Sequence, residues 1–128
     1  MITRKAIFAM VVVGIATVPA RSEPLIEAGT TPDGSVYSVD FATKKRVGDK
    51  AEVWLFVDHS KDKSAKAHTS RELWKFYCSQ QSSLTAYIVQ YDGRGRVILS
   101  RNEPDNPYMY EPIVPETLGS FAMNFACS

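Results

Sequence analysis

The sequence predicts an α+β domain: one antiparallel β-sheet of about six strands, with a C-terminal α-helix packed on one face and tethered to it by a disulfide. Three observations support this prediction. Short runs of alternating apolar and polar residues lie between positions 35 and 101, and a helical pattern follows only near the C-terminus. The chain has two cysteines, Cys78 at the end of one predicted strand and Cys127 at the end of the predicted helix. Strands followed by a helix are typical of an α+β fold.

The first twenty residues have the pattern of a secretory signal peptide. Arg4 and Lys5 form a positively charged n-region, and the apolar segment that follows, 6–17, is too short to span a bilayer. Val18 and Ala20 provide the small residues of a cleavage site after Ala20. We therefore expect a signal peptide at 1–20, a leader at 21–33 and a folded domain at 34–128, which suits a chain of 128 residues.

Export sets the expected location and the state of the cysteines. No cysteine follows the apolar run, so we expect a periplasmic, secreted or cell-surface protein that is not lipid-anchored and has no stable membrane insertion after cleavage. Two cysteines in an exported chain favour one disulfide, Cys78 to Cys127. A redox pair usually has CxxC spacing and a structural zinc site four ligands, and neither pattern is present.

The predicted strands differ in how many of their faces are apolar. Five strands are predicted at 35–41, 51–58, 71–78, 84–91 and 96–101. Residues 108–114 form either a short sixth strand or merely extended chain. Residues 25–26 are long enough only for a short edge strand. The 51–58 strand is apolar on both faces and is predicted to be central and covered on both sides. In the 71–78 strand, Trp74, Phe76 and Cys78 share one face.

The helix predicted at 115–127 leaves its orientation open. One apolar stripe consists of Leu118, Phe121, Ala122 and Phe125, whereas Cys127 lies on the opposite side, with Gly119 and Met123. Either the helix frays before Cys127, or the small face packs on the sheet and the stripe needs another cover, such as a second subunit.

Composition and motifs argue against several functions. Without Arg4 and Lys5 the chain has thirteen basic and fourteen acidic residues, so nothing points to nucleic acid. No G-x-S-x-G elbow or paired carboxylates are evident, and the Gly93–Arg96 segment reads as a hairpin turn whose glycines supply positive φ. We expect no catalytic residues and no cofactor. The alternative is a metal-dependent factor in which His59 and His68 bind an ion, although their spacing matches no known ligand motif.

Two segments are candidate contact surfaces. Lys44, Lys45 and Arg46 at a predicted hairpin tip are suited to an acidic partner. Tyr108 and Tyr110, between prolines, are suited to an exposed protein contact.

Five features in order resemble the surface-adhesin protein E family of Gram-negative bacteria. They are Val53-Trp54, the strand ending in Trp74-Lys75-Phe76-Tyr77-Cys78, the hairpin at 91–97, the Pro112-Ile113-Val114-Pro115 entry to the helix, and Cys127. The resemblance, over residues 34–128, implies a sheet of about six strands, with the helix held by the two cysteines. Its named member is a surface lipoprotein that dimerises and binds matrix and serum proteins of the host.

The resemblance therefore implies an exported, non-enzymatic binding or adhesion module with a protein partner, and a possible homodimer. The alternative is a periplasmic envelope protein whose partner is another bacterial protein.

Overall fold

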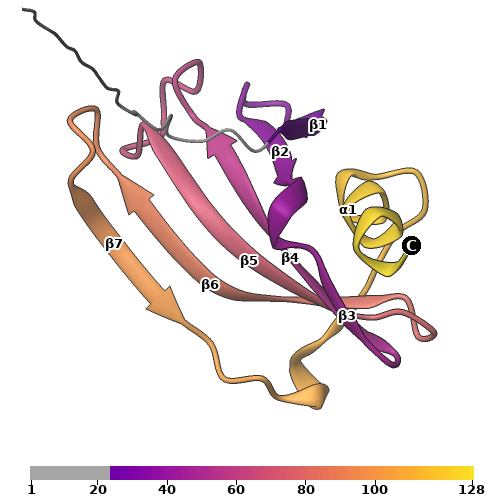
Figure 1. Cartoon of the computed structure of the whole chain (residues 1–128). Coiled ribbons are helices and arrows are strands. Elements are labelled where there is room, and N and C mark those ends of the chain that lie inside the picture. Colours follow the sequence, from indigo (N-terminus) through magenta and orange to yellow (C-terminus); the bar gives the residue numbers. More distant parts are fainter. Residues whose placement is uncertain (1–23) are drawn as a thin grey trace, which may run out of the picture.

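The structure, a computed structural model, describes residues 24–128, so the predicted signal peptide at 1–20 lies outside the described residues. It confirms the α+β class: one antiparallel sheet with a single C-terminal helix in the described part of the chain (Figure 1). The strands are β1 Leu25–Thr30, β2 Val36–Asp40, β3 Lys45–Val47, β4 Lys50–Asp58, β5 Thr69–Tyr77, β6 Ser82–Tyr91, β7 Val97–Asn102 and β8 Glu111–Pro112.

The sheet has eight strands, two more than the six expected, because the short segments β1 and β3 also pair. The main order is β1-β2-β4-β5-β6-β7, with β3 beside β4 and β8 beside β6. The edge strand foreseen at 25–26 extends to Thr30 along β2. The polar segment at 43–50, predicted as a turn, contains β3, so only Gly48 and Asp49 form the turn. β8 is two residues long and ends at Pro112, although the next amide, that of Ile113, still donates to the Gln81 carbonyl.

The core lies on the sheet face that is covered by the C-terminal helix, α1, Leu118–Cys127. Val53 and Leu55 of β4 are fully buried, and Val53 pairs with Trp74 on β5, which places Trp74 and Phe76 on the same face, as the alternation predicts. Burying apolar side chains of this size contributes about 1.5–3 kcal/mol each.

The opposite face of β4 was predicted to be covered, and this prediction is only half right. Trp54 and Phe56 are half-buried on that face, and no helix of the described chain lies over them. Trp54 packs on Tyr87 with ring centroids 5.8 Å apart, and Arg71 lies over Phe56, 5.8 Å from its centroid. Aromatic pairs and a cation thus shield this face instead of a second layer.

The helix α1, Leu118–Cys127, begins three residues later than predicted. Thr117 is the N-cap: its hydroxyl accepts from the Ser120 amide, and Glu116 before it has a positive φ of 62°. Glu116, which falls within the predicted range 115–127, therefore lies outside the helix.

The small face of α1 packs on the sheet, which decides the orientation that the sequence left open. The buried residues of α1 are Met123 and Ala126 together with Ala122, which was predicted in the apolar stripe but also packs on the sheet. The disulfide between Cys78 and Cys127 forms as predicted. The outer stripe is covered in part by the chain itself. Phe41 packs edge to face on Phe125, with centroids 5.6 Å apart, and Leu118 lies against Gly29 of β1. The stripe needs no second subunit for this cover, and the homodimer stays a prediction.

Candidate binding surface

The segment between β7 and β8 is held against the sheet by Asp105. Its carboxylate accepts from the Lys50 ammonium at 2.6 Å and from the Tyr110 hydroxyl at 2.8 Å, and Lys75 lies 3.7 Å away. The hydrogen bond from Lys50 is the main cause that lowers the pKa of Asp105 below its ordinary value. One carboxylate therefore joins the loop to β4 and β5.

Tyr110 anchors the same loop from its other end. Its ring packs on that of Tyr77 of β5 in a tilted arrangement, with centroids 4.5 Å apart. Burial, with the hydrogen bond to Asp105, raises the pKa of Tyr110 well above its ordinary value, so the phenol stays protonated and donates. Of the two predicted tyrosines, Tyr110 is thus a support of the loop.

Between these anchors the chain presents Tyr108 to solvent. A 3-10 turn, Pro107–Met109, is capped by Asn106, whose side chain accepts from the Tyr108 amide at 3.0 Å. Tyr108 is 94% exposed and Met109 59% exposed. An aromatic side chain on an anchored loop loses little conformational freedom when it meets a partner, which suits a contact residue.

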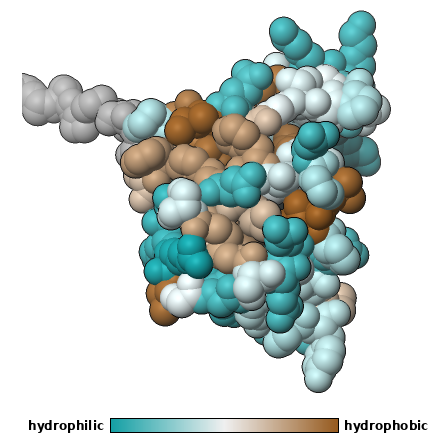
Figure 2. Space-filling view, turned by 90° about the vertical axis from the view of Figure 1, so that its right-hand side faces the viewer, coloured by the Kyte–Doolittle hydropathy of each residue, from teal (hydrophilic) through white to brown (hydrophobic). Residues whose placement is uncertain are grey.

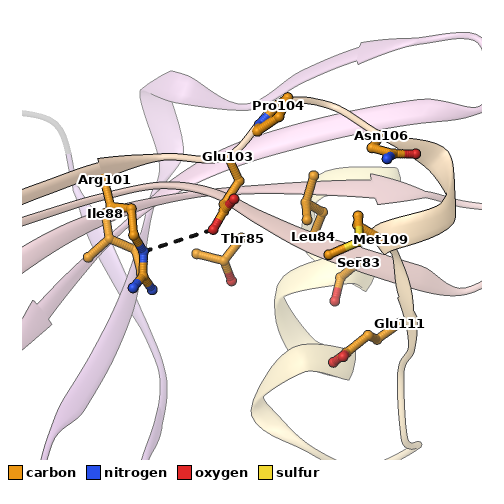
Figure 3. Close-up of a pocket in the computed structure, with 10 residues that line it drawn as sticks. All are labelled: Ser83, Leu84, Thr85, Ile88, Arg101, Glu103, Pro104, Asn106, Met109 and Glu111. Carbon is orange, nitrogen blue, oxygen red and sulfur yellow. Dashed lines mark ion pairs between the residues drawn. The ribbon is translucent and has the colours of Figure 1, made fainter.

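Beside Met109 lies a cavity of about 490 Å³, between the outer edge of β6 and the loop. It is drawn in Figure 3, where the side chain of Glu103 points toward Arg101, and Glu111 lies at the end away from Pro104. Apolar contacts come from Leu84, Ile88 and Met109. Sequence patterns do not predict this cavity. The one signal for it is the pair of prolines Pro104 and Pro107, which interrupts strand pairing.

The cavity exists because β6 lacks a strand partner along part of this edge. Tyr87 pairs with Asn102 of β7, and Ser83 pairs with Glu111 of β8, but no strand of the described chain pairs with 84–86 on that side. The Glu103 amide caps only the Ala86 carbonyl, at 2.8 Å. The chain leaves the ladder after Asn102 and rejoins it at Glu111, so residues 103–110 lie outside the ladder.

The predicted basic cluster is distributed along β3 and the residue before it. Lys44 donates to the Ser128 hydroxyl at 2.8 Å and lies 5.3 Å from the centre of the Phe125 ring. The Arg46 guanidinium donates to the Cys127 carbonyl. Lys45 pairs with Glu52 across the strands and is exposed. Lys44 and Arg46 thus contact the end of α1, which leaves Lys45 as the cluster's most available charge.

His59 does not share an ion site with His68, because its ring is held by two serines. His59 lies between two buried serines, with its Nδ1 2.8 Å from Ser35 Oγ and its Nε2 2.9 Å from Ser70 Oγ. Both ring nitrogens are therefore occupied. Within residues 24–128, no three His, Cys, Asp or Glu side chains are close enough to share a metal ion.

A second exposed surface is apolar and lies on the α1 side of the molecule. Brown and tan residues spread across this face in Figure 2. Among its members Phe41 is 53% and Phe121 40% exposed. Exposed apolar area of this kind is typical of interaction surfaces.

Together the fold and surface define a small sheet-and-helix domain that is closed by one disulfide and exposes Tyr108 most of its large apolar residues, within residues 24–128. The family model of surface-adhesin protein E matches residues 25–128, and the chain belongs to this family. Comparison with curated proteins and with solved structures finds no match. Membership makes the protein adhesin-like, with a protein partner and an exported or cell-surface location. Within the described residues, no helix has the length and apolar character needed to cross a membrane.

Proposed function

We propose that this protein is a non-enzymatic binding module that contacts a host matrix or serum protein through the loop at 103–110. The observation that carries the proposal is Tyr108, 94% exposed at the apex of a loop fixed by Asp105 and Tyr110. Family membership supports an adhesin-like role, and the fixed loop supports a preformed contact surface.

Charge adds to the proposed surface. Lys45 lines a small hollow with Lys50, Lys75 and Asp105, so the exposed end of β3 adjoins the base of the loop. We propose Lys45 as a rim charge, which affects the association rate and the salt dependence more than the final affinity.

The experiment compares Tyr108→Ala with the parent in binding to immobilised vitronectin and laminin, a serum and a matrix protein. Loss of a central aromatic contact weakens binding at least ~10-fold, because such residues contribute about 2 kcal/mol or more. Val97→Ala is the matched control, since Val97 is 58% exposed on β7, outside the loop. Equal binding by the parent and Tyr108→Ala would remove the loop from the interface.

If the parent binds neither protein, a bacterial envelope partner becomes the better proposal. Affinity capture from envelope extracts, with Tyr108→Ala as the negative bait, then identifies it. A partner retained equally by both baits would count against the loop in this case too.

A further inference from the structure

We infer that the cavity beside Met109 takes the cationic side chain of an arginine or lysine, from a partner segment bound in extended conformation along β6. The inference rests on the proposed function and gives the chemistry of the protein partner. It is carried by three observations: the charges around the cavity, its apolar wall and the free stretch of β6.

The cavity carries an excess of negative charge. Glu103 and Glu111 line it, and Arg101 is the only basic side chain among the lining residues. Arg101 Nε is 4.0 Å from a Glu103 oxygen, and their side chains are 63% and 48% exposed, so this pair is weak. One carboxylate is therefore left without a counterion in the cavity wall. An incoming ammonium or guanidinium supplies that counterion and makes charge-assisted hydrogen bonds, the stronger kind in proteins.

The apolar wall suits the stem of a long basic side chain. Leu84 and Ile88 of β6 and Met109 of the 3-10 turn all line the cavity (Figure 3). Lysine and arginine lay their methylene groups along apolar surface while the charged end stays polar. Methionine adapts its shape to such a stem because it is unbranched and flexible. The volume of about 490 Å³ lies within the ordinary range of ligand sites.

The backbone of β6 supplies the extended chain with hydrogen-bonding groups. The Ile113 amide donates to the Gln81 carbonyl at 2.9 Å, so Gln81 directs its peptide groups toward β8. The Ala86 carbonyl, which accepts from the Glu103 amide at 2.8 Å, is turned to this side as well, because the register of β6 against β5 shifts between Thr85 and Tyr87. Ser83 pairs with β8, whereas Thr85 has no strand partner there in the described chain. A short extended segment completes this edge, as in β-strand addition.

Other occupants fit less well. An acidic side chain meets two carboxylates and one already paired arginine. An uncharged apolar side chain would remove Glu103 and Glu111 from water without giving them a partner, which costs free energy. The cationic side chain is the one class that both the wall and the charges favour.

The test uses blocked pentapeptides Ac-Thr-Val-Xaa-Val-Thr-amide, where Xaa is Arg, Lys, Gln or Glu, titrated into the full chain and followed by calorimetry. We expect the Arg and Lys peptides to bind at least ~10-fold more tightly than the Gln peptide, with the Glu peptide weakest, since tenfold corresponds to about 1.4 kcal/mol. In the double variant Glu103→Gln/Glu111→Gln, the preference for Arg over Gln falls below ~3-fold. Glu27→Gln on β1 is the matched control and keeps the preference of the parent.

Each contrary outcome is separable from the proposed function. Equal binding of the four peptides, or a preference that survives in the double variant, overturns the inference. If no peptide binds while Tyr108→Ala still weakens binding to vitronectin or laminin, the inference fails and the proposed function stands. Thermal unfolding of each variant shows that it is folded. If the double variant unfolds, the single variants Glu103→Gln and Glu111→Gln replace it. Each is expected to halve the preference for the Arg peptide over the Gln peptide, and a preference equal to that of the parent in both variants overturns the inference.

Discussion

Arg46 donates a hydrogen bond from its guanidinium to the main-chain carbonyl oxygen of Cys127, the last residue of α1. The last carbonyls of a helix have no partners within the helix and form the negative end of its dipole. A cation from β3 therefore stabilises the same residue that the disulfide fixes to β5.

The first prediction follows from this contact. Arg46→Ala lowers the free energy of unfolding by about 0.3–1 kcal/mol, the usual contribution of a cation at a helix C-terminus. Lys45→Ala, one position away on β3 and without this contact, is the control and leaves stability unchanged. Urea unfolding of both variants measures the difference. Equal loss of stability in the two would show that the Arg46 contact contributes nothing.

The second prediction concerns the disulfide. The double variant Cys78→Ser/Cys127→Ser loses about 4 kcal/mol of stability in the chain-entropy account, because the bond closes a loop of 49 residues. The loss appears as a lower urea midpoint than that of the oxidised parent. The parent in reductant should unfold at the midpoint of the double variant, and a midpoint unchanged by reduction would contradict this account.

The third prediction uses Glu72, a half-buried carboxyl that faces the core side of β5, where it pairs with Leu55. Burial raises the pKa of Glu72, although the Trp74 indole donates to its oxygen at 2.9 Å. Because the folded state binds the proton more tightly, this group lowers stability when ionised. The free energy of unfolding therefore increases as pH falls from the raised folded pKa of Glu72 toward its unfolded value of about 4.3. Glu72→Gln keeps the acceptor for Trp74, so it raises the melting temperature at pH 7 and reduces the pH dependence. A lower melting temperature at pH 7 would disprove this.

The parts of the fold that the sequence predicts correctly depend on local pattern. Alternation predicted that both faces of the 51–58 strand are covered: Val53 and Leu55 on one face are fully buried, whereas Trp54 and Phe56 on the other are half-buried. Two cysteines in a chain expected to be exported predicted the disulfide that the structure contains. Each of these inferences needs only neighbouring residues or a count, so no knowledge of the tertiary arrangement was required.

The parts that were missed depend on contacts distant in sequence. The basic residues at 44–46 looked like a free tip, but Arg46 meets Cys127, 81 positions away. The cavity arises where the chain leaves β6 and is pinned by Asp105 to Lys50, 55 positions away. Patterns within a window of residues do not contain such pairings. Single substitution of Lys45 is therefore a cleaner binding test than replacing the whole cluster, which also loosens α1.

The last prediction is that Asp105 sets the stability and the shape of the binding loop. Asp105→Ala removes the acceptor of Lys50 and Tyr110, and it lowers the free energy of unfolding at pH 7 by about 1 kcal/mol, the upper end for exposed pairs. Since the folded pKa of Asp105 is lowered, its contribution is full above the unfolded value of about 3.9 and is lost as pH falls through the folded value. The parent and Asp105→Ala should thus converge in stability below pH 4. Tyr110→Phe removes only the hydroxyl and keeps the ring packed on Tyr77, so its smaller loss separates the hydrogen bond from the packing. If Asp105→Ala matches the parent at pH 7 and still binds vitronectin or laminin equally well, the loop does not need this anchor.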